Sequence, residues 1–340
     1  MIDLRRNRYL DPIAHRWLEW VKTVLTEKHT KGYLPSLKDE KKDRTQVQIN
    51  FKSYEDKLKY QCRKKVFEYA KTKAEQKYCL ELLNKLWENV DSIILATPVQ
   101  MESLMKRLHR RMPLALNFIG VLADILVSYY EIVSKKCAVE LVEELGVKTC
   151  PYCNRQFIYS FKGVRKERPE LDHFLPKQDN PLFCLSFYNL VPVCHSCNHE
   201  KLEDRLQVNP YVKGFQSSFM ITDKNGEKLS KSKIFHLTEK EIRLRFENPT
   251  PEEDVNIRTL GLEDVYNKHK DYVKELIDKS MAYDAHARRA LVESFQGAGV
   301  NPRQVYDFVW GRHLIDAEYE DRPLSKLTKD VLEQLEIRRG

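Results

Sequence analysis

The sequence predicts an α+β protein, mostly α-helical, in which a small central module held by a metal is flanked by helical regions. Long stretches with helical spacing of apolar residues and few glycines or prolines occupy both ends of the 340-residue chain. Between them, residues 146–215 are rich in Pro, Cys and Asn and contain two Cys-x-x-Cys pairs. We therefore expect three parts: a helical basic N-terminal region (1–145), a metal-containing domain (146–215), and a C-terminal hairpin with a helical region (216–340).

Local patterns justify the flanking elements in chain order. Apolar spacing predicts a short helix over 12–25, and the stretch 53–90, which lacks Gly and Pro, predicts further helix. The turn signal DKNGEK between alternating runs predicts a β-hairpin over 219–246, and helical spacing returns from about Leu262.

One apolar segment imitates a membrane span. Residues 113–133 are about long enough to cross a bilayer, but Asn117, Asp124 and Glu131 lie seven apart and form one polar stripe on a helix. Asp124 at mid-membrane would cost about 3 kcal/mol, so we expect a buried helix and no membrane association. The N-terminal MIDLRRNRYLDP has charges where a signal peptide has an apolar region, which predicts a cytoplasmic protein.

The positive charge is unevenly distributed. The net charge is +8, and all of it falls on residues 1–149. The densest part, residues 41–77, has twelve basic and five acidic residues and includes Arg63, Lys64 and Lys65. Such a cluster suits a phosphate backbone, because neutralised phosphates release counterions. A solvated helix face is the alternative for this basic run.

Two cysteine pairs are the strongest chemical signal. CPYC contains Cys150 and Cys153, and VCHSC contains Cys194 and Cys197. CPYC alone also fits a redox-active pair, but that pair requires a following helix, whereas NRQFIYSF predicts a strand. Two Cys-x-x-Cys pairs supply the four thiolates of a closed tetrahedral site. The sequence therefore predicts a structural Zn²⁺ bound by these four cysteines.

Two short strands and a helix are expected between and after the cysteine pairs. Alternating apolar residues predict strands at 171–175 and 190–193, and HSCNHEKLEDRL predicts a helix that starts at the second pair. The polar side chains in or beside these elements are Asp172, His173, Asn189, Asn198 and His199.

This order of strand, strand and helix, with LDHFLPK and YNLVPVCHSCN, resembles the HNH (ββα-metal) endonucleases. The zinc-stapled form with Asn after the last cysteine is similar to endonuclease VII and, with RPLSKLTKD near the end, to HNH proteins of bacterial antiphage operons. The resemblance covers about residues 148–206. It implies a central HNH module and a phosphodiester hydrolase that acts on nucleic acid, with DNA the default substrate, and a role in antiphage defence.

The resemblance also implies a role for each polar residue. His173 matches the family's first histidine, the general base that deprotonates the attacking water. Asp172 and Asn198 would hold a catalytic Mg²⁺ or Mn²⁺, with His199 as a competing ligand. Asn189 matches the central Asn, which orients the base through backbone hydrogen bonds.

Some assignments stay open at the level of sequence. Lys177 and Lys201 lie close to the motif and are candidate phosphate contacts, as any surface lysine would be. An alternative function is a zinc-stapled nucleic-acid-binding or adaptor protein with an idle nuclease site. Its long helical flanks would then dock a regulatory partner such as an ATPase.

Overall fold

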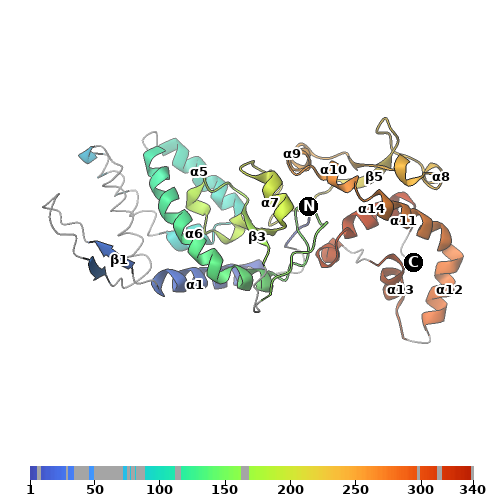
Figure 1. The fold of residues 1–340 in the computed structure, drawn as a ribbon, viewed down its shortest axis with the longest axis horizontal. Helices are drawn as coiled ribbons and strands as arrows, with labels where there is room; N and C mark the ends of the chain where they lie inside the picture. Colours follow the sequence, from blue (N-terminus) through green and yellow to red (C-terminus); the bar gives the residue numbers. More distant parts are fainter. Residues whose placement is uncertain are drawn as a thin grey trace. The chain divides into compact units, whose positions relative to one another are not determined.

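The computed structural model describes residues 1–5, 9–27, 30–33, 46–49, 72–74, 77, 81, 89–111, 116–161, 168–296, 299–311 and 316–337. In this part the protein is mixed α/β and mostly helical (Figure 1). None of the helices described is both long and apolar enough to span a bilayer. The chain divides into two compact units: unit 1 comprises Met1–Arg8, Leu145–Asp172 and Pro192–Gly340, and unit 2 comprises Tyr9–Glu144 and His173–Val191. The predicted division at 145 and 215 stays a prediction.

Unit 2 is built mainly from helices. Its described elements are α1 (Leu10–Glu27), β1 (Thr30–Tyr33), β2 (Gln46–Ile49), α4 (Val90–Ile94), α5 (Pro98–Arg111), α6 (Leu116–Leu145) and the 3₁₀ turns η1 (Pro181–Phe183) and η2 (Phe187–Asn189). Strands β1 and β2 pair antiparallel. Ile13, Trp17 and Val21 are buried at a spacing of four residues, which confirms the predicted helix over 12–25.

Two helices of unit 2 bind the segment that contains η1 and η2. The indole of Trp17 in α1 donates to the carbonyl of Leu185 at 2.9 Å. The hydroxyl of Ser186 donates to the carbonyl of Ile93 in α4 at 2.6 Å. Because all four of these residues are buried, the two bonds satisfy backbone carbonyls that water does not reach.

The expected pair of strands and the following helix are present. They are β3 (Glu170–His173), β4 (Leu190–Val193) and α7 (His195–Lys201), and β3 and β4 form a two-stranded sheet. Helix α7 is shorter than predicted, since Leu202 has a left-handed φ of 46° that stops helical hydrogen bonding. The strand predicted for NRQFIYSF is wrong in extent: in the described residues this segment forms isolated bridges, of which the one between Thr149 and Phe157 is antiparallel.

The predicted hairpin of unit 1 is present with a longer connection. Strands β5 (Ser218–Thr222) and β6 (Arg243–Glu247) pair antiparallel from Ser218 opposite Glu247 to Thr222 opposite Arg243. After the turn at DKNGEK, the chain forms a single antiparallel bridge, between Thr222 and Lys228, instead of a paired strand. Helix α8 (Lys231–Ile234) and the 3₁₀ turn η3 (Glu239–Glu241) then precede β6. The local turn signal was therefore right, and the pairing partner comes from further along the chain.

Helices complete unit 1, as predicted from Leu262 onward. They are α9 (Pro251–Thr259), α10 (Leu262–Tyr266), α11 (Lys270–Ala282), α12 (Ala285–Gln296), α13 (Pro302–Trp310), the 3₁₀ turn η4 (Asp316–Asp321) and α14 (Ser325–Gln334) (Figure 1). Side chains of α14 bond the backbone of β5: Asp330 accepts from Phe219 N at 2.8 Å and Gln334 from Ile221 N at 2.7 Å. Helix α14 thereby satisfies an edge that would otherwise present unpaired amides.

Candidate functional site

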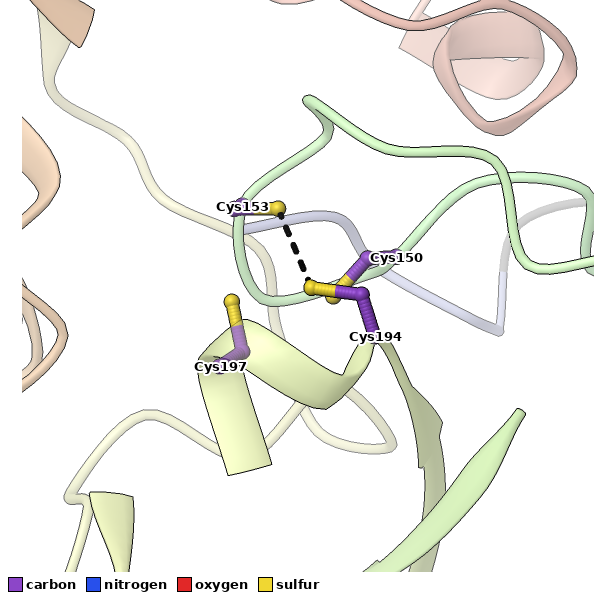
Figure 2. A group of neighbouring side chains, drawn as sticks. All are labelled: Cys150, Cys153, Cys194 and Cys197. Atoms are coloured by element: carbon purple, nitrogen blue, oxygen red, sulfur yellow. Dashed lines mark hydrogen bonds between the residues drawn. The ribbon is translucent and has the colours of Figure 1, made fainter. Parts of the chain in front are cut away.

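A cluster of four cysteines is the best-defined site in the described part of unit 1. Cys150, Cys153, Cys194 and Cys197 are all buried, and their sulfur atoms lie within 4.8 Å of one another. Figure 2 shows the four sulfurs converging from the loop of the first pair and from the start of α7. The Cys153 and Cys194 sulfurs are 3.9 Å apart.

The geometry and the donor set fit a metal ion such as zinc. Zinc bound to four thiolates at about 2.3 Å in a tetrahedron separates the sulfurs by about 3.8 Å. Burial raises the pKa of Cys150, whereas hydrogen bonds from the Cys150, Cys194 and Cys197 thiols lower the pKa of Cys153 well below its usual range. Four buried thiols therefore cannot all ionise together without a cation to offset their charge.

Tight local turns place the four sulfurs. In the first pair, Asn154 N donates to Cys150 O at 2.7 Å, and Cys150 N donates to Gln156 O at 2.9 Å. Asn154 adopts a left-handed φ of 48°, a conformation that Asn tolerates better than most residues. In the second pair, Cys194 is the N-cap residue of α7 and Cys197 lies in its first turn.

The C-terminal part of unit 1 braces the first cysteine pair. The side-chain amide of Asn154 donates to the backbone carbonyl of Tyr319 at 2.7 Å. The backbone carbonyl of Asn154 accepts from Leu324 N at 2.6 Å. The hydroxyl of Tyr266 donates to the carbonyl of Cys153. The RPLSKLTKD stretch, for which the sequence alone indicated no structural role, therefore supports the first cysteine pair.

Asp172 lies inside unit 1 with both carboxylate oxygens bonded. Lys201 Nζ is 3.1 Å from Oδ1, and the Tyr152 hydroxyl donates to Oδ2 at 2.6 Å. The Lys201 and Asp172 side chains are only 1% and 4% exposed. Burial raises the pKa of Asp172, and the charge of Lys201 opposes that shift. Lys201 is thus an interior partner of Asp172, away from the surface that a phosphate contact would require.

Glu170, two residues earlier on β3, has a partly exposed carboxylate, and no local sequence pattern predicts a role for it. Asn198 Nδ2 donates to Glu170 Oε2 at 2.5 Å, and His195 Nδ1 lies 2.7 Å from Oε1. The hydrogen bond to Glu170 raises the pKa of His195. His199 is exposed, and its ring is stacked on that of His195 with 6.0 Å between centroids. Because Asn198 turns its amide nitrogen to Glu170, its Oδ1 faces away from that carboxylate.

In unit 2, His173 is held by a backbone carbonyl. Its Nε2 is 3.0 Å from Cys184 O, and since a carbonyl can only accept, Nε2 carries the proton. When the imidazole is neutral, its basic lone pair is then on Nδ1. The Tyr130 ring meets the imidazole edge-on at 4.4 Å between centroids, and Lys177 Nζ lies 5.9 Å over the same Tyr130 ring.

Asn189 fixes the loop that follows His173. Its Oδ1 accepts from Leu175 N at 2.7 Å, and its Nδ2 donates to the carbonyls of Leu175 and Phe183 at 3.2 and 3.0 Å. Its backbone carbonyl accepts from Phe174 N at 2.9 Å. The fully buried side chain of Asn189 thus bonds both Leu175 and Phe183, the two ends of this loop. The next residue, Cys184, provides the carbonyl that binds His173.

The remaining predicted contacts divide into two groups. Lys177 is half-buried beside Tyr130. Arg63, Lys64 and Lys65 lie outside the described residues, as does most of the basic stretch 41–77. Their predicted contacts with nucleic acid stay predictions.

Comparisons with protein-family models, with curated proteins and with solved structures found no match for this chain. The class of protein therefore follows from its own geometry. The fold and the site define a mixed α/β, mostly helical protein with a buried four-cysteine centre able to hold a metal ion.

Proposed function

We propose that the protein is a metal-dependent HNH-type endonuclease that hydrolyses phosphodiester bonds in nucleic acid, with DNA as the default substrate. The observation that supports this best is the Asn189 network. An Asn that binds only backbone groups, in the loop that positions a histidine, is what the resemblance implies for the central Asn of an HNH site. The proposal extends to a cytoplasmic role in antiphage defence.

His173 would act as the general base. Its Nε2–H is engaged by Cys184 O, so Nδ1 is the atom that would take the proton of the attacking water. A neutral imidazole suits this task at pH 7 because its ordinary pKa lies close to that pH. The four cysteines would serve a separate, structural purpose by holding Zn²⁺.

A divalent Mg²⁺ or Mn²⁺ would supply the positive charge that stabilises the developing charge on phosphate. Among the candidate ligands, Asn198 fits best, since Glu170 binds its amide nitrogen and leaves Oδ1 directed elsewhere. His199 is exposed on the same helix. Asp172 fits poorly in this state, because Lys201 and Tyr152 occupy both of its oxygens.

The engagement of Asp172 also favours the second candidate function. If that carboxylate is permanently paired inside the protein, the site is idle, and the molecule is a zinc-stapled nucleic-acid-binding or adaptor protein. Its helical flanks would then dock a regulatory partner such as an ATPase.

A cleavage assay separates the two functions. Purified protein is incubated with plasmid, single-stranded DNA and RNA in Mg²⁺, Mn²⁺ or EDTA, beside His173→Ala and the control His236→Ala, which removes an exposed histidine outside the motif. We expect His173→Ala to lower the cleavage rate by about 10² to 10⁴, because the base is lost. The control should cleave like the wild type, and both variants should keep their zinc.

Two results would contradict the endonuclease. Activity of His173→Ala within tenfold of wild type would leave no role for the base. Full activity in EDTA would exclude a catalytic Mg²⁺ or Mn²⁺.

A further inference from the structure

Three aromatic side chains stand exposed on the segment that follows the first cysteine pair. Phe157, Tyr159 and Phe161 are 41%, 54% and 45% exposed, whereas Ile158 between them is buried. Alternate residues of an extended chain point to opposite sides, so these aromatic rings share the outer side. An outward row of large apolar rings costs solvation free energy in an isolated molecule and marks a binding surface.

The first two rings already form a flat platform. The Phe157 and Tyr159 rings are stacked, with centroids 4.9 Å apart and an angle of 17° between their planes. Near-parallel rings at this spacing present aromatic faces of the kind on which a nucleobase stacks.

The platform is fixed to the cysteine cluster. Phe157 pairs with Thr149 in an antiparallel bridge, and Ile158 N donates to Lys148 O at 2.9 Å. Gln156, the residue before Phe157, donates from Nε2 to the hydroxyl of Ser196 on α7 at 3.3 Å. Ser196 lies two residues before Asn198, so a strand bound on the platform would run beside the helix that carries the candidate cation ligand.

The sequence that continues from the platform favours a polyanion. Residues 155–168 contain five basic residues and one acidic residue. Of the basic ones, Arg168 is exposed, whereas Lys162, Arg165 and Lys166 lie outside the described residues. Aromatic rings interleaved with basic residues are the usual composition of surfaces that bind single-stranded nucleic acid. A protein partner that docks on apolar surface alone would have no use for this excess of positive charge.

We propose that Phe157 and Tyr159 form a stacking platform for unpaired bases, and that the substrate is single-stranded or locally unpaired nucleic acid. This inference rests on the proposed function, since it names the substrate class of the same site. Bases within a duplex are stacked on one another, so they reach such a platform only after unpairing.

The test is binding of fluorescein-labelled oligo(dT) of about 20 nucleotides, and of its duplex with oligo(dA), to the full zinc-loaded chain without added Mg²⁺. Fluorescence anisotropy should show tighter binding of the single strand. Phe157→Ala and Tyr159→Ala should each weaken that binding about fivefold to a hundredfold, because one stacked base is lost. Phe157→Trp should retain it.

Two control variants sharpen the result. Phe308→Ala removes an aromatic ring that is 73% exposed on α13 and should leave binding unchanged. Phe157→Leu keeps apolar area but has no aromatic face, and we expect it to bind as weakly as Phe157→Ala. Zinc content and melting temperature of every variant should match the wild type, since the rings are exposed.

Several outcomes would overturn the platform. They are wild-type affinity in both alanine variants, full affinity in Phe157→Leu, which would show that apolar contact suffices without an aromatic face, and no preference for the single strand. The endonuclease is judged separately by cleavage and its dependence on His173. A protein that cleaves plasmid normally with Phe157→Ala and Tyr159→Ala in place would keep the proposed function and lose this inference.

Discussion

The two faces of helix α7 make opposite use of polar side chains. On the buried face, Cys197 joins the cysteine cluster and Lys201 pairs with Asp172, so the lysine and the carboxylate neutralise each other inside unit 1. On the outer face, His195 and Asn198 bind the half-exposed Glu170. The difference separates the roles of a seven-residue helix: changes on the buried face should reduce stability, and changes on the outer face should alter ligand binding.

Strand β3 contributes one carboxylate to each face of α7. Glu170 and Asp172 are two apart, so they lie on the same side of the strand. Glu170 meets the first turn of α7 through His195 and Asn198, and Asp172 meets its last residue, Lys201. The helix therefore runs along the strand, and of the two carboxylates Glu170 is partly exposed whereas Asp172 is buried.

The largest effect is expected at the buried face. Cys197→Ser should abolish tight zinc binding and unfold unit 1, because structural zinc contributes about 10–16 kcal/mol, comparable with the whole stability of a domain. Metal analysis should find about one zinc per wild-type chain and far less in the variant. Cys137→Ala, which removes a buried thiol of α6, is the control and should keep its zinc. A folded Cys197→Ser variant with full zinc would refute the cluster.

The next effect concerns the buried ion pair. Lys201→Met leaves the Asp172 charge without its cation, which should cost about 3–5 kcal/mol at neutral pH. Burial already raises the pKa of Asp172, and losing Lys201 should raise it further. A carboxyl whose folded pKa exceeds its unfolded pKa stabilises the fold while protonated, and that contribution is lost as pH rises through the folded pKa. The variant should therefore be closest to wild type at acid pH and weakest at neutral pH.

Urea denaturation over a pH series measures this dependence. The double variant Lys201→Met with Asp172→Asn removes both charges, and we expect it to be more stable at neutral pH than Lys201→Met alone. If the stability lost by Lys201→Met were the same at acid and neutral pH, Asp172 would not be the group left unpaired.

These comparisons show what the sequence could predict. The cysteine cluster could be predicted from the sequence because each Cys-x-x-Cys pair is a local motif. Four thiolates complete the coordination of one zinc ion regardless of how the chain folds between the pairs. Strand β4 and the start of α7 also matched their patterns. The partners of Glu170, His195 and Asn198, lie 25 and 28 residues further along the chain, and no local sequence pattern predicts contacts over such a separation. The burial of Lys201 is equally absent from any local pattern, because lysine is seldom buried unless it is paired and its partner Asp172 is just as remote along the chain.

The smallest effect is expected at the open end, where Glu170 orients Asn198. Glu170→Ala removes the acceptor for Asn198 Nδ2, so the amide is free to turn and Oδ1 loses its fixed direction. We expect the affinity of the zinc-loaded protein for Mn²⁺, followed by electron paramagnetic resonance, to fall about tenfold. Zinc content and melting temperature should hardly change, because the carboxylate is partly exposed.

Two variants distinguish orientation from simple charge. Glu170→Gln loses the charge but keeps an oxygen that accepts from Asn198, so it should bind Mn²⁺ nearly as well as wild type. Glu200→Ala removes an exposed charge from the same helix without touching Asn198 in the described structure, and it should also bind normally. Equal losses in Glu170→Gln and Glu170→Ala would show that the charge itself attracts the cation. Absence of Mn²⁺ binding in the wild type would contradict the proposed catalytic cation. The outer face of α7 would then be interpreted as a docking surface of the alternative adaptor protein.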